Sequence, residues 1–323
     1  MKQSRHARRT TAQTCAAMPE SCMISPMKTL ASLSLILPLA LFAPFAMHCA
    51  RAPSEHQSRI TRNIVYGNAF MAEKERETPT PQPLRMDVIA PPRTVAPPYP
   101  AAILIHGGAF ERGARNDEQQ VQLAHTLAKH GYACFLIAYR LIRDNPPAPL
   151  PYDDPLSKAA HAAVVDTKTA LRHVHANAAA YEVDPHRVAL IGASAGAIAA
   201  LGAGLSEPDQ FSDDGPDFPP PPENNTQVEA RAAAIVNLWG TADFFLELFS
   251  ENAPPIMTVH GAKDFTTGLS LLPAENIDAQ CREHGVPHHY YPLSDAGHGP
   301  WDAMVDGKPL DALVLQFLDT YLK

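Results

Sequence analysis

The sequence predicts an α/β fold, with a mostly parallel central sheet and helices on both of its faces. From Ala101 onward, short apolar segments alternate with longer segments of helical periodicity, which is typical of successive strand–helix units. Several apolar segments have no polar face, as strands require when helices cover both sides of a sheet. A chain of 323 residues is long enough to bury the core of such a sheet.

Two segments of alternating polarity precede this pattern and predict a pair of neighbouring antiparallel edge strands. They lie at 60–66 and 84–90, and Pro91-Pro92 stops the second. The buried strands that follow are predicted at 101–105, 132–138, 188–191, 232–238, 255–259 and 288–293.

Helices are predicted between these strands, where apolar residues recur three and four positions apart. Asn116 or Asp117 is expected to cap the first helix and Gly131 to end it, while Asp184-Pro185 is expected to turn the chain. The other helices are predicted at 157–179, from within the turn 192–196 to about 205, at about 273–284 and at 310–321.

Two proline-rich stretches, 143–155 and 206–228, are predicted to be irregular loops. The second is expected to lie over one end of the sheet, and its composition does not predict a large helical cap. The stripe of small apolar residues along 157–179 is interrupted only by Lys168. Because there is no internal repeat, residues 51–323 are interpreted as one domain.

Residues 1–50 are predicted to be a targeting segment. Lys28 precedes an apolar run from Leu30 to Met47, and this order is typical of a secretory signal peptide. Met27 would begin a compact signal, so we interpret it as the initiator. The protein is therefore expected to be secreted or periplasmic. An uncleaved membrane anchor is the alternative, although the run is barely long enough to span a bilayer and contains two prolines.

Charge and cysteine content exclude some classes of protein. Residues 1–50 hold five basic residues and one acidic residue, so without them the formal charge moves from −8 to −12. An acidic body argues against nucleic acid as a partner and favours neutral substrates. Of the five cysteines, only Cys134 and Cys281 fall in the predicted domain. We interpret them as core residues, with a single bridge between them as the alternative. The sequence does not predict the oligomeric state.

The stretch 188–201 combines a buried strand, a sharp turn with one serine, and a helix of small residues. Its turn, 192–196, fits the pattern G-x-S-x-G, which lifts a serine above the end of a sheet. A side chain at Gly192 or Gly196 would obstruct the close approach of strand and helix. The alternative is a packing corner of small residues without catalytic use.

Ser194, Asp264 and His298 each follow a predicted strand, at the edge where parallel sheets form their binding crevice. A serine hydroxyl needs a base, which His298 would supply, and the imidazole needs an orienting acid, which Asp264 would supply. Asp243, after the preceding strand, is the alternative acid. Asp264 is preferred because its strand comes directly before the strand that delivers His298. Asp264 as a helix cap and His298 as a turn residue are the structural alternatives.

Acyl transfer also needs N–H donors for the oxyanion that develops at the carbonyl. The segment 106–110 follows the strand that would neighbour the serine strand, so Gly108 and Ala109, together with Ala195, are the predicted donors. His106 itself is interpreted as structural. His284, His288 and His289 have no carboxylate at ligand spacing, and His173 and His175 would point to different sides of a helix, so no metal site is expected. No cofactor is expected either.

These motifs together resemble the α/β-hydrolase carboxylesterases. The matching residues are His-Gly-Gly-Ala-Phe at 106–110, Tyr139-Arg140, Val-Asp-Pro-His-Arg at 183–187, Gly-Ala-Ser-Ala-Gly at 192–196, His-Gly-x-x-Asp at 260–264 and Gly-His-Gly at 297–299. The resemblance is strongest to the branch of hormone-sensitive-lipase-like and acetylxylan/feruloyl esterase-like enzymes, and it covers about residues 84–323. It implies an α/β-hydrolase fold and the Ser194–Asp264–His298 triad.

Two departures from that family bear on the substrate. Ala109 replaces the usual third glycine, which keeps the N–H but narrows the acyl pocket, and Ala197 replaces the usual glycine after Ser-Ala-Gly. The absence of a predicted helical cap favours the acetylxylan/feruloyl type with an open cleft. We therefore expect a secreted serine carboxylesterase for small or polysaccharide-linked esters. A serine peptidase of the prolyl-oligopeptidase type and a non-catalytic binding protein with a hydrolase fold are the alternatives.

Overall fold

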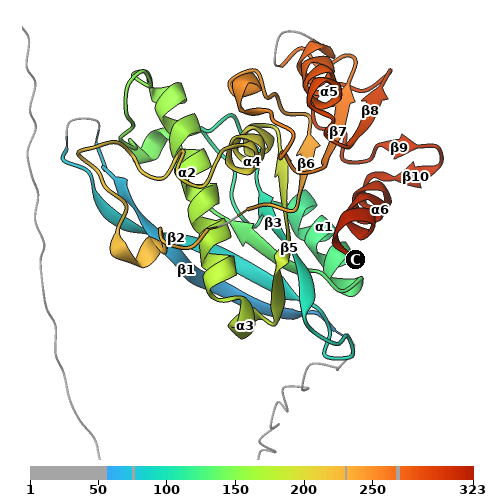
Figure 1. Cartoon of the computed structure of the whole chain (residues 1–323), viewed down its shortest axis with the longest axis horizontal. Helices are drawn as coiled ribbons and strands as arrows, with labels where there is room; N and C mark the ends of the chain where they lie inside the picture. Colours follow the sequence, from blue (N-terminus) through green and yellow to red (C-terminus); the bar gives the residue numbers. More distant parts are fainter. Residues whose placement is uncertain (1–56, 75–76, 230, 267–269) are drawn as a thin grey trace, which may run out of the picture. The chain divides into compact units, whose positions relative to one another are not determined.

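An eight-stranded sheet lies at the centre of the computed structural model, which describes residues 57–74, 77–229, 231–266 and 270–323 (Figure 1). The predicted targeting segment, 1–50, lies outside the described residues. The strand order is β1-β2-β4-β3-β5-β6-β7-β8. The strands are β1 (Arg59–Met71), β2 (Thr80–Ala90), β3 (Tyr99–Ile105), β4 (Ala133–Ile137), β5 (Val183–Ala193), β6 (Ala234–Leu238), β7 (Ile256–Gly261) and β8 (His288–Leu293).

Six of these strands, from β4 to β8 in the sheet order, run parallel, and β1 and β2 are antiparallel. Helices pack on both faces of the sheet, with α2, α4 and α5 contributing to one apolar core and α1 and α6 to the other. The predicted α/β fold is thereby confirmed. The helices are α1 (Glu118–Lys129), α2 (Pro155–Ala176), α3 (Ala178–Tyr181), α4 (Ala195–Leu205), α5 (Leu272–His284) and α6 (Leu310–Leu322).

The centre of the sheet sets the position of the site. All seven residues of β3 are buried. This agrees with the fully apolar sequence of the segment 101–105, which predicted a strand covered on both faces. Strand β3 pairs with β4 on one side and with β5 on the other, so the chain order reverses at β3. The crevice outside the carboxyl ends of such strands is where open α/β sheets bind ligands.

The edge of the sheet differs from the prediction in one respect. Strands β1 and β2 are antiparallel neighbours as predicted, but β2 also pairs with β4 and is therefore internal. Both strands extend beyond the segments of alternating polarity from which they were predicted. Their antiparallel pairing continues as far as Met71 and Thr80, where the sequence is polar. Of these two strands, only β1 lies at an edge of the sheet.

Two predicted boundaries are wrong for identifiable reasons. Helix α2 begins at Pro155 because Asp154 caps it, accepting hydrogen bonds from the N–H groups of Leu156 and Ser157. It ends at Ala176, and Asn177 separates it from the short α3. The Asp184-Pro185 segment belongs to β5 instead of a turn, since β5 begins at Val183 beside Tyr99.

Short elements escaped prediction because two or three residues carry no usable periodicity. A hairpin of β9 (Met304–Val305) and β10 (Lys308–Pro309) precedes α6. Single 3₁₀ turns occur at Ile142–Asp144, Pro222–Asn224 and Leu246–Leu248. Asp117 precedes α1 as expected, but its side chain makes no capping bond.

The 206–228 loop is held by buried ions. Lys168, the residue that interrupts the apolar stripe of α2, donates to the Ser206 hydroxyl (3.1 Å) and to the Glu207 carbonyl (2.6 Å). Arg140, which follows β4, bonds both to Asp166 of α2 and to Asp214 of the loop. Among the described residues no helical domain covers the carboxyl edge of the sheet, as predicted.

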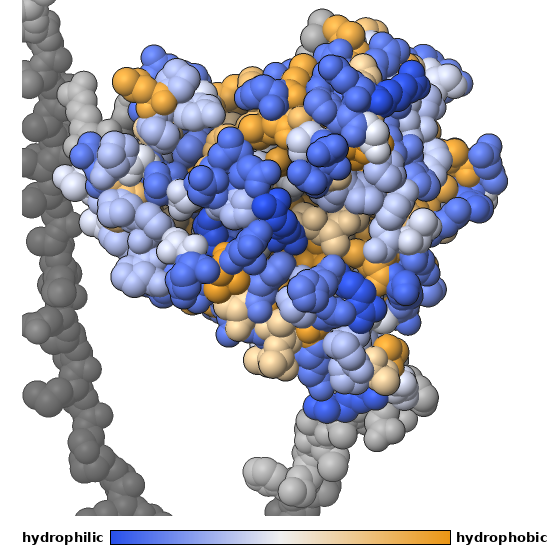
Figure 2. Space-filling view, viewed as in Figure 1, coloured by the Kyte–Doolittle hydropathy of each residue, from blue (hydrophilic) through white to orange (hydrophobic). Residues whose placement is uncertain are grey.

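The two cysteines of the described chain are both free and buried, so no bridge joins Cys134 and Cys281. Helices long and apolar enough to cross a membrane are absent from the described residues. Figure 2 shows a surface on which hydrophilic residues predominate and apolar residues appear in separate patches. Such scattered apolar patches are ordinary on a folded domain.

Candidate active site

Ser194 lies at a strained turn between β5 and α4. Its backbone φ is 54°, in the left-handed region that residues with a Cβ rarely adopt, and its N–H donates to the carbonyl of Leu238 (2.8 Å). The turn is also tightly packed, because a Cβ on Gly192 would lie 2.2 Å from the Gly196 carbonyl oxygen. A strand and a helix can meet this closely only with glycine at that position. The geometry is that of a nucleophile elbow.

A continuous hydrogen-bonded line joins Ser194, His298 and Asp264. The distance from Ser194 Oγ to His298 Nε2 is 2.8 Å, and the distance from His298 Nδ1 to Asp264 Oδ2 is 2.7 Å. The Asp264 side chain is fully buried, and its other oxygen accepts from the N–H of Thr266 (3.0 Å). The three side chains come from the ends of β5, β7 and β8, so the parallel sheet brings together residues that are far apart in sequence.

Asp243, the alternative acid, is not part of this line. Its side chain is exposed and accepts a hydrogen bond from the amide of Asn276 (2.8 Å). The carboxylate beside His298 Nδ1 is that of Asp264.

A second histidine, His260, touches the acid of this line and was missed by the sequence analysis. Its Nε2 lies 3.4 Å from Asp264 Oδ2, the ring is fully buried, and neither ring nitrogen has a hydrogen-bond partner among the described residues. Burial lowers the pKa of His260, which favours the neutral form of the ring. The only signal in the sequence was the motif His-Gly-x-x-Asp at 260–264, of which Asp264 alone received a role.

The glycine-rich segment after β3 borders the serine. Gly108 has φ 120° and Ala109 has φ 57°, so both adopt conformations that glycine favours. Within the described chain, the N–H groups of Gly108, Ala109 and Ala195 donate no hydrogen bond to another protein group. Gly108 and Ala109 line the cleft that contains Ser194, and Ala195 directly follows it at the start of α4. Unused donors at a helix N-terminus and an adjacent turn favour a negatively charged oxygen.

His106, which begins the glycine-rich segment, packs against Tyr139. Its ring stacks on Tyr139 with the centroids 4.3 Å apart, and the Tyr139 hydroxyl donates to the His106 carbonyl (2.8 Å). The ring is buried, which lowers the pKa of His106. These contacts fit the structural interpretation of His106.

The cleft above Ser194 has a volume of about 490 Å³ and includes His298, Trp239 and Trp301 in its walls. The two indoles meet edge to face, with centroids 5.0 Å apart. Both tryptophans were missed by the sequence analysis, because nothing in their spacing placed them beside the serine. Trp301 follows His298 by three residues, so the loop that delivers the base also delivers an aromatic wall.

The described chain holds no group of three or more histidine, cysteine, aspartate or glutamate side chains that could hold a metal ion. His288 instead contacts Asp278 (3.0 Å) and Thr258 (3.0 Å).

A serine at an elbow, a histidine with a buried carboxylate and free N–H donors define the class of serine-dependent hydrolases with an α/β sheet. A family model places the chain within that class. The BD-FAE model matches residues 86–252, just over half of the chain. The chain belongs to the BD-FAE family of α/β-hydrolase esterases and is a carboxylic ester hydrolase. The predicted resemblance to α/β-hydrolase carboxylesterases is confirmed.

Solved structures share the fold at low sequence identity. A truncated carbohydrate esterase from gut microbiota has a TM-score of 0.61 and 18% identity, covering 83% of this chain and 98% of its own. Thermogutta terrifontis esterase 2, phosphorylated by paraoxon, has a TM-score of 0.58 and 18% identity, covering 82% and 93%. A bifunctional GH43-CE protein of Bacteroides eggerthii has a TM-score of 0.59 and 19% identity, covering 82% and 38%. No curated protein sequence matches the chain.

Proposed function

We propose that the protein hydrolyses small or carbohydrate-linked carboxylic esters through an acyl-enzyme on Ser194. The observation that carries this proposal is the line of two short hydrogen bonds from Ser194 through His298 to the buried Asp264. Family membership supports the ester bond as the target. Carbohydrate esterases among the structures of similar fold support sugar-linked esters as the substrate class.

In the first half of the reaction, Ser194 Oγ attacks the ester carbonyl carbon and its proton passes to His298 Nε2. The Nδ1–H of His298 donates to Asp264, whose negative charge stabilises the imidazolium that forms. The N–H groups of Gly108, Ala109 and Ala195 stabilise the oxyanion, and loss of one such donor typically costs about 3 kcal/mol of transition-state stabilisation.

The tetrahedral intermediate then collapses, and His298 gives its proton to the oxygen of the departing alcohol. The acyl group remains on Ser194. In the second half, His298 takes a proton from water, the hydroxide oxygen bonds to the acyl carbon, and the carboxylic acid leaves as Ser194 recovers its proton.

The open cleft supports compact acyl groups. Ala109 brings a methyl group to the wall beside the oxyanion donors, where a glycine would leave more room. No helical cap lies over the described sheet edge to enclose a long chain. We therefore infer a preference for short acyl groups over long ones.

The experiment compares the native protein with Ser194→Ala and His298→Ala on 4-nitrophenyl acetate. We expect both variants to lose at least about 10⁴-fold in kcat, because the nucleophile and its base act as one unit. Circular dichroism and the unfolding midpoint control for misfolding. Unchanged turnover by a folded Ser194→Ala protein would refute the acyl-enzyme.

Export of the protein is a further part of this proposal and rests on residues 1–50 alone. The test expresses the chain from Met1 and from Met27 and follows esterase activity in cell fractions. The proposal requires activity outside the cytoplasm from the Met27 start, with the apolar run removed from the mature protein. Activity confined to the cytoplasm would refute it.

A further inference from the structure

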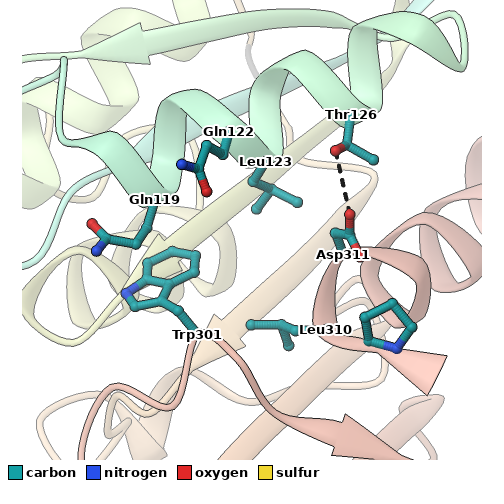
Figure 3. Close-up of a pocket in the computed structure, with 8 residues that line it drawn as sticks. Gln119, Gln122, Leu123, Thr126, Trp301, Leu310 and Asp311 are labelled. Atoms are coloured by element: carbon teal, nitrogen blue, oxygen red, sulfur yellow. Dashed lines mark hydrogen bonds between the residues drawn. The ribbon is translucent and has the colours of Figure 1, made fainter. Parts of the chain in front are cut away.

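A second hollow adjoins the cleft beside Trp301, between helix α1 and the start of α6 (Figure 3). It has a volume of about 280 Å³, and we call it the outer hollow. Gln119 and Trp301 line both the outer hollow and the cleft, so the two spaces adjoin at the indole. The residues that line the outer hollow alone are Gln122, Leu123, Thr126, Pro309, Leu310 and Asp311.

The walls of the outer hollow differ in chemistry. Gln119 and Gln122 are three residues apart on α1, so their amides share one face of the helix. Figure 3 shows them on one side of the hollow, with the Trp301 ring and Leu310 on the other. At the far end, the Thr126 hydroxyl donates to Asp311 Oδ2 (3.3 Å). The apolar side chains of Trp301 and Leu310 therefore face the polar amides across the hollow. Such a space is suited to a ligand with one apolar face and many hydroxyl groups.

The charge of the walls narrows the ligand further. Of the described residues that line the outer hollow, Asp311 is the only charged one, and neither lysine nor arginine is among them. A carboxylate repels a phosphate or an acidic sugar but accepts hydrogen bonds from hydroxyl groups. A neutral sugar ring has C–H groups that pack on an indole and hydroxyls that pair with amides and carboxylates.

The reaction chemistry indicates which part of the substrate faces this side. His298 protonates the departing alcohol oxygen, so the alcohol lies on the side of His298. Trp301 lies on the same loop, three residues further along. The group attached to the alcohol oxygen is therefore directed past Trp301, toward the outer hollow.

We propose that the outer hollow is a subsite for the neutral sugar unit that carries the ester, with Trp301 packing on the sugar ring. Gln119, Gln122 and Asp311 then bind the hydroxyl groups. This subsite rests on the proposed function, because it requires Ser194 to act on an ester of which the sugar is the alcohol.

The test uses two esters of one acid, 4-nitrophenyl acetate and acetylated xylotriose. Gln122 is suitable for substitution because it is exposed and lines only the outer hollow. Gln122→Trp fills the hollow, and we expect it to lower kcat/KM for acetylated xylotriose by roughly tenfold or more through a raised KM. Hydrolysis of 4-nitrophenyl acetate should stay within about twofold of native, because this alcohol does not reach the hollow. Gln280→Trp, on helix α5 outside both spaces, is the matched control.

A second measurement detects binding without turnover. The chain has two tryptophans, Trp239 and Trp301, so indole emission reports on the site. Titrating folded Ser194→Ala protein with xylotriose should give a saturable change in emission, and the additional substitution Trp301→Phe should abolish it.

The outcomes separate the subsite from the proposed function. Three results would overturn the subsite and leave ester hydrolysis standing. Gln122→Trp could affect both esters equally, it could have no effect on the sugar ester, or the native protein could hydrolyse only the aryl ester. Retained turnover of both esters by Ser194→Ala would instead overturn the proposed function.

Discussion

Replacing Arg140 with methionine should destabilise the protein strongly, because this guanidinium neutralises two buried carboxylates. The Arg140 and Asp166 side chains are fully buried and that of Asp214 is 5% exposed. Arg140 Nη2 lies 2.7 Å from Asp166 Oδ1, and Arg140 Nη1 lies 2.6 Å from Asp214 Oδ2. Methionine matches only the aliphatic stem of arginine and carries no charge, so the substitution removes the ion and keeps the apolar contacts of that stem.

The size of the effect follows from this burial. Removing one partner of a buried ion pair costs about 3–5 kcal/mol, because the remaining charge has lost its compensation. The backbone N–H of Arg140, which also donates to Asp166 (2.8 Å), survives the substitution and limits the loss for that carboxylate. We expect a loss of about 3–5 kcal/mol in the free energy of unfolding and a fall in Tm of about 6–20 °C.

The assay is urea unfolding of Arg140→Met beside a matched control, Arg231→Met. Arg231 also pairs with two carboxylates, Glu207 and Glu229, each at 2.8 Å, but its side chain is 53% exposed. Solvent screens such pairs, so the control should lose less than about 1 kcal/mol. Equal losses for the two variants, or a loss below about 1 kcal/mol for Arg140→Met, would refute the account of a buried network.

The loss should also depend on pH. Burial raises the pKa of the Asp166 and Asp214 carboxyls, and the Arg140 guanidinium opposes this by lowering it. Without Arg140, the folded-state pKa of both groups rises further above the unfolded value of 3.8. The folded variant then binds more protons than the unfolded chain, so its stability falls as pH rises through that window. Arg140→Met should therefore be destabilised more at pH 8 than at pH 5.5.

Two other predictions concern the site. Asp264→Asn should lower kcat on 4-nitrophenyl acetate by about 10³–10⁴-fold, since an amide favours the wrong tautomer of His298. Asp243→Asn is the control and should have little effect on kcat. The opposite ranking of the two variants would make Asp243 the acid. Gly192→Ala should destabilise the fold by about 2 kcal/mol or more and impair turnover, because its Cβ would meet backbone at 2.2 Å. Gly297→Ala, whose Cβ would meet nothing closer than 3.7 Å, should remain near native in the same unfolding and activity measurements.

The alternation of apolar and helical segments predicted the sheet, because burial on both faces leaves no polar positions in strands such as β3. The same argument placed Ser194, Asp264 and His298 at one edge, since the carboxyl ends of parallel strands meet there. Choosing Asp264 over Asp243 rested only on strand order, and the structure pairs Asp264 with His298.

Contacts between side chains that are far apart in the sequence could not be predicted from these patterns. Arg140 and Asp214 are 74 positions apart, and no periodicity links a residue after β4 to a proline-rich loop. Likewise, the burial of His260 against Asp264 and the position of Trp301 beside the cleft depend on how loops fold back over the sheet edge. These features required the packed structure.

The central claim is that Ser194 is the nucleophile of an esterase, and covalent trapping tests it most directly. The protein is treated with paraoxon, and the intact mass and the modified peptide are determined by mass spectrometry. We predict the addition of one diethylphosphoryl group at Ser194, loss of esterase activity in proportion, and no addition to folded Ser194→Ala. Inactivation with the label on another residue, or equal labelling of Ser194→Ala, would contradict the account.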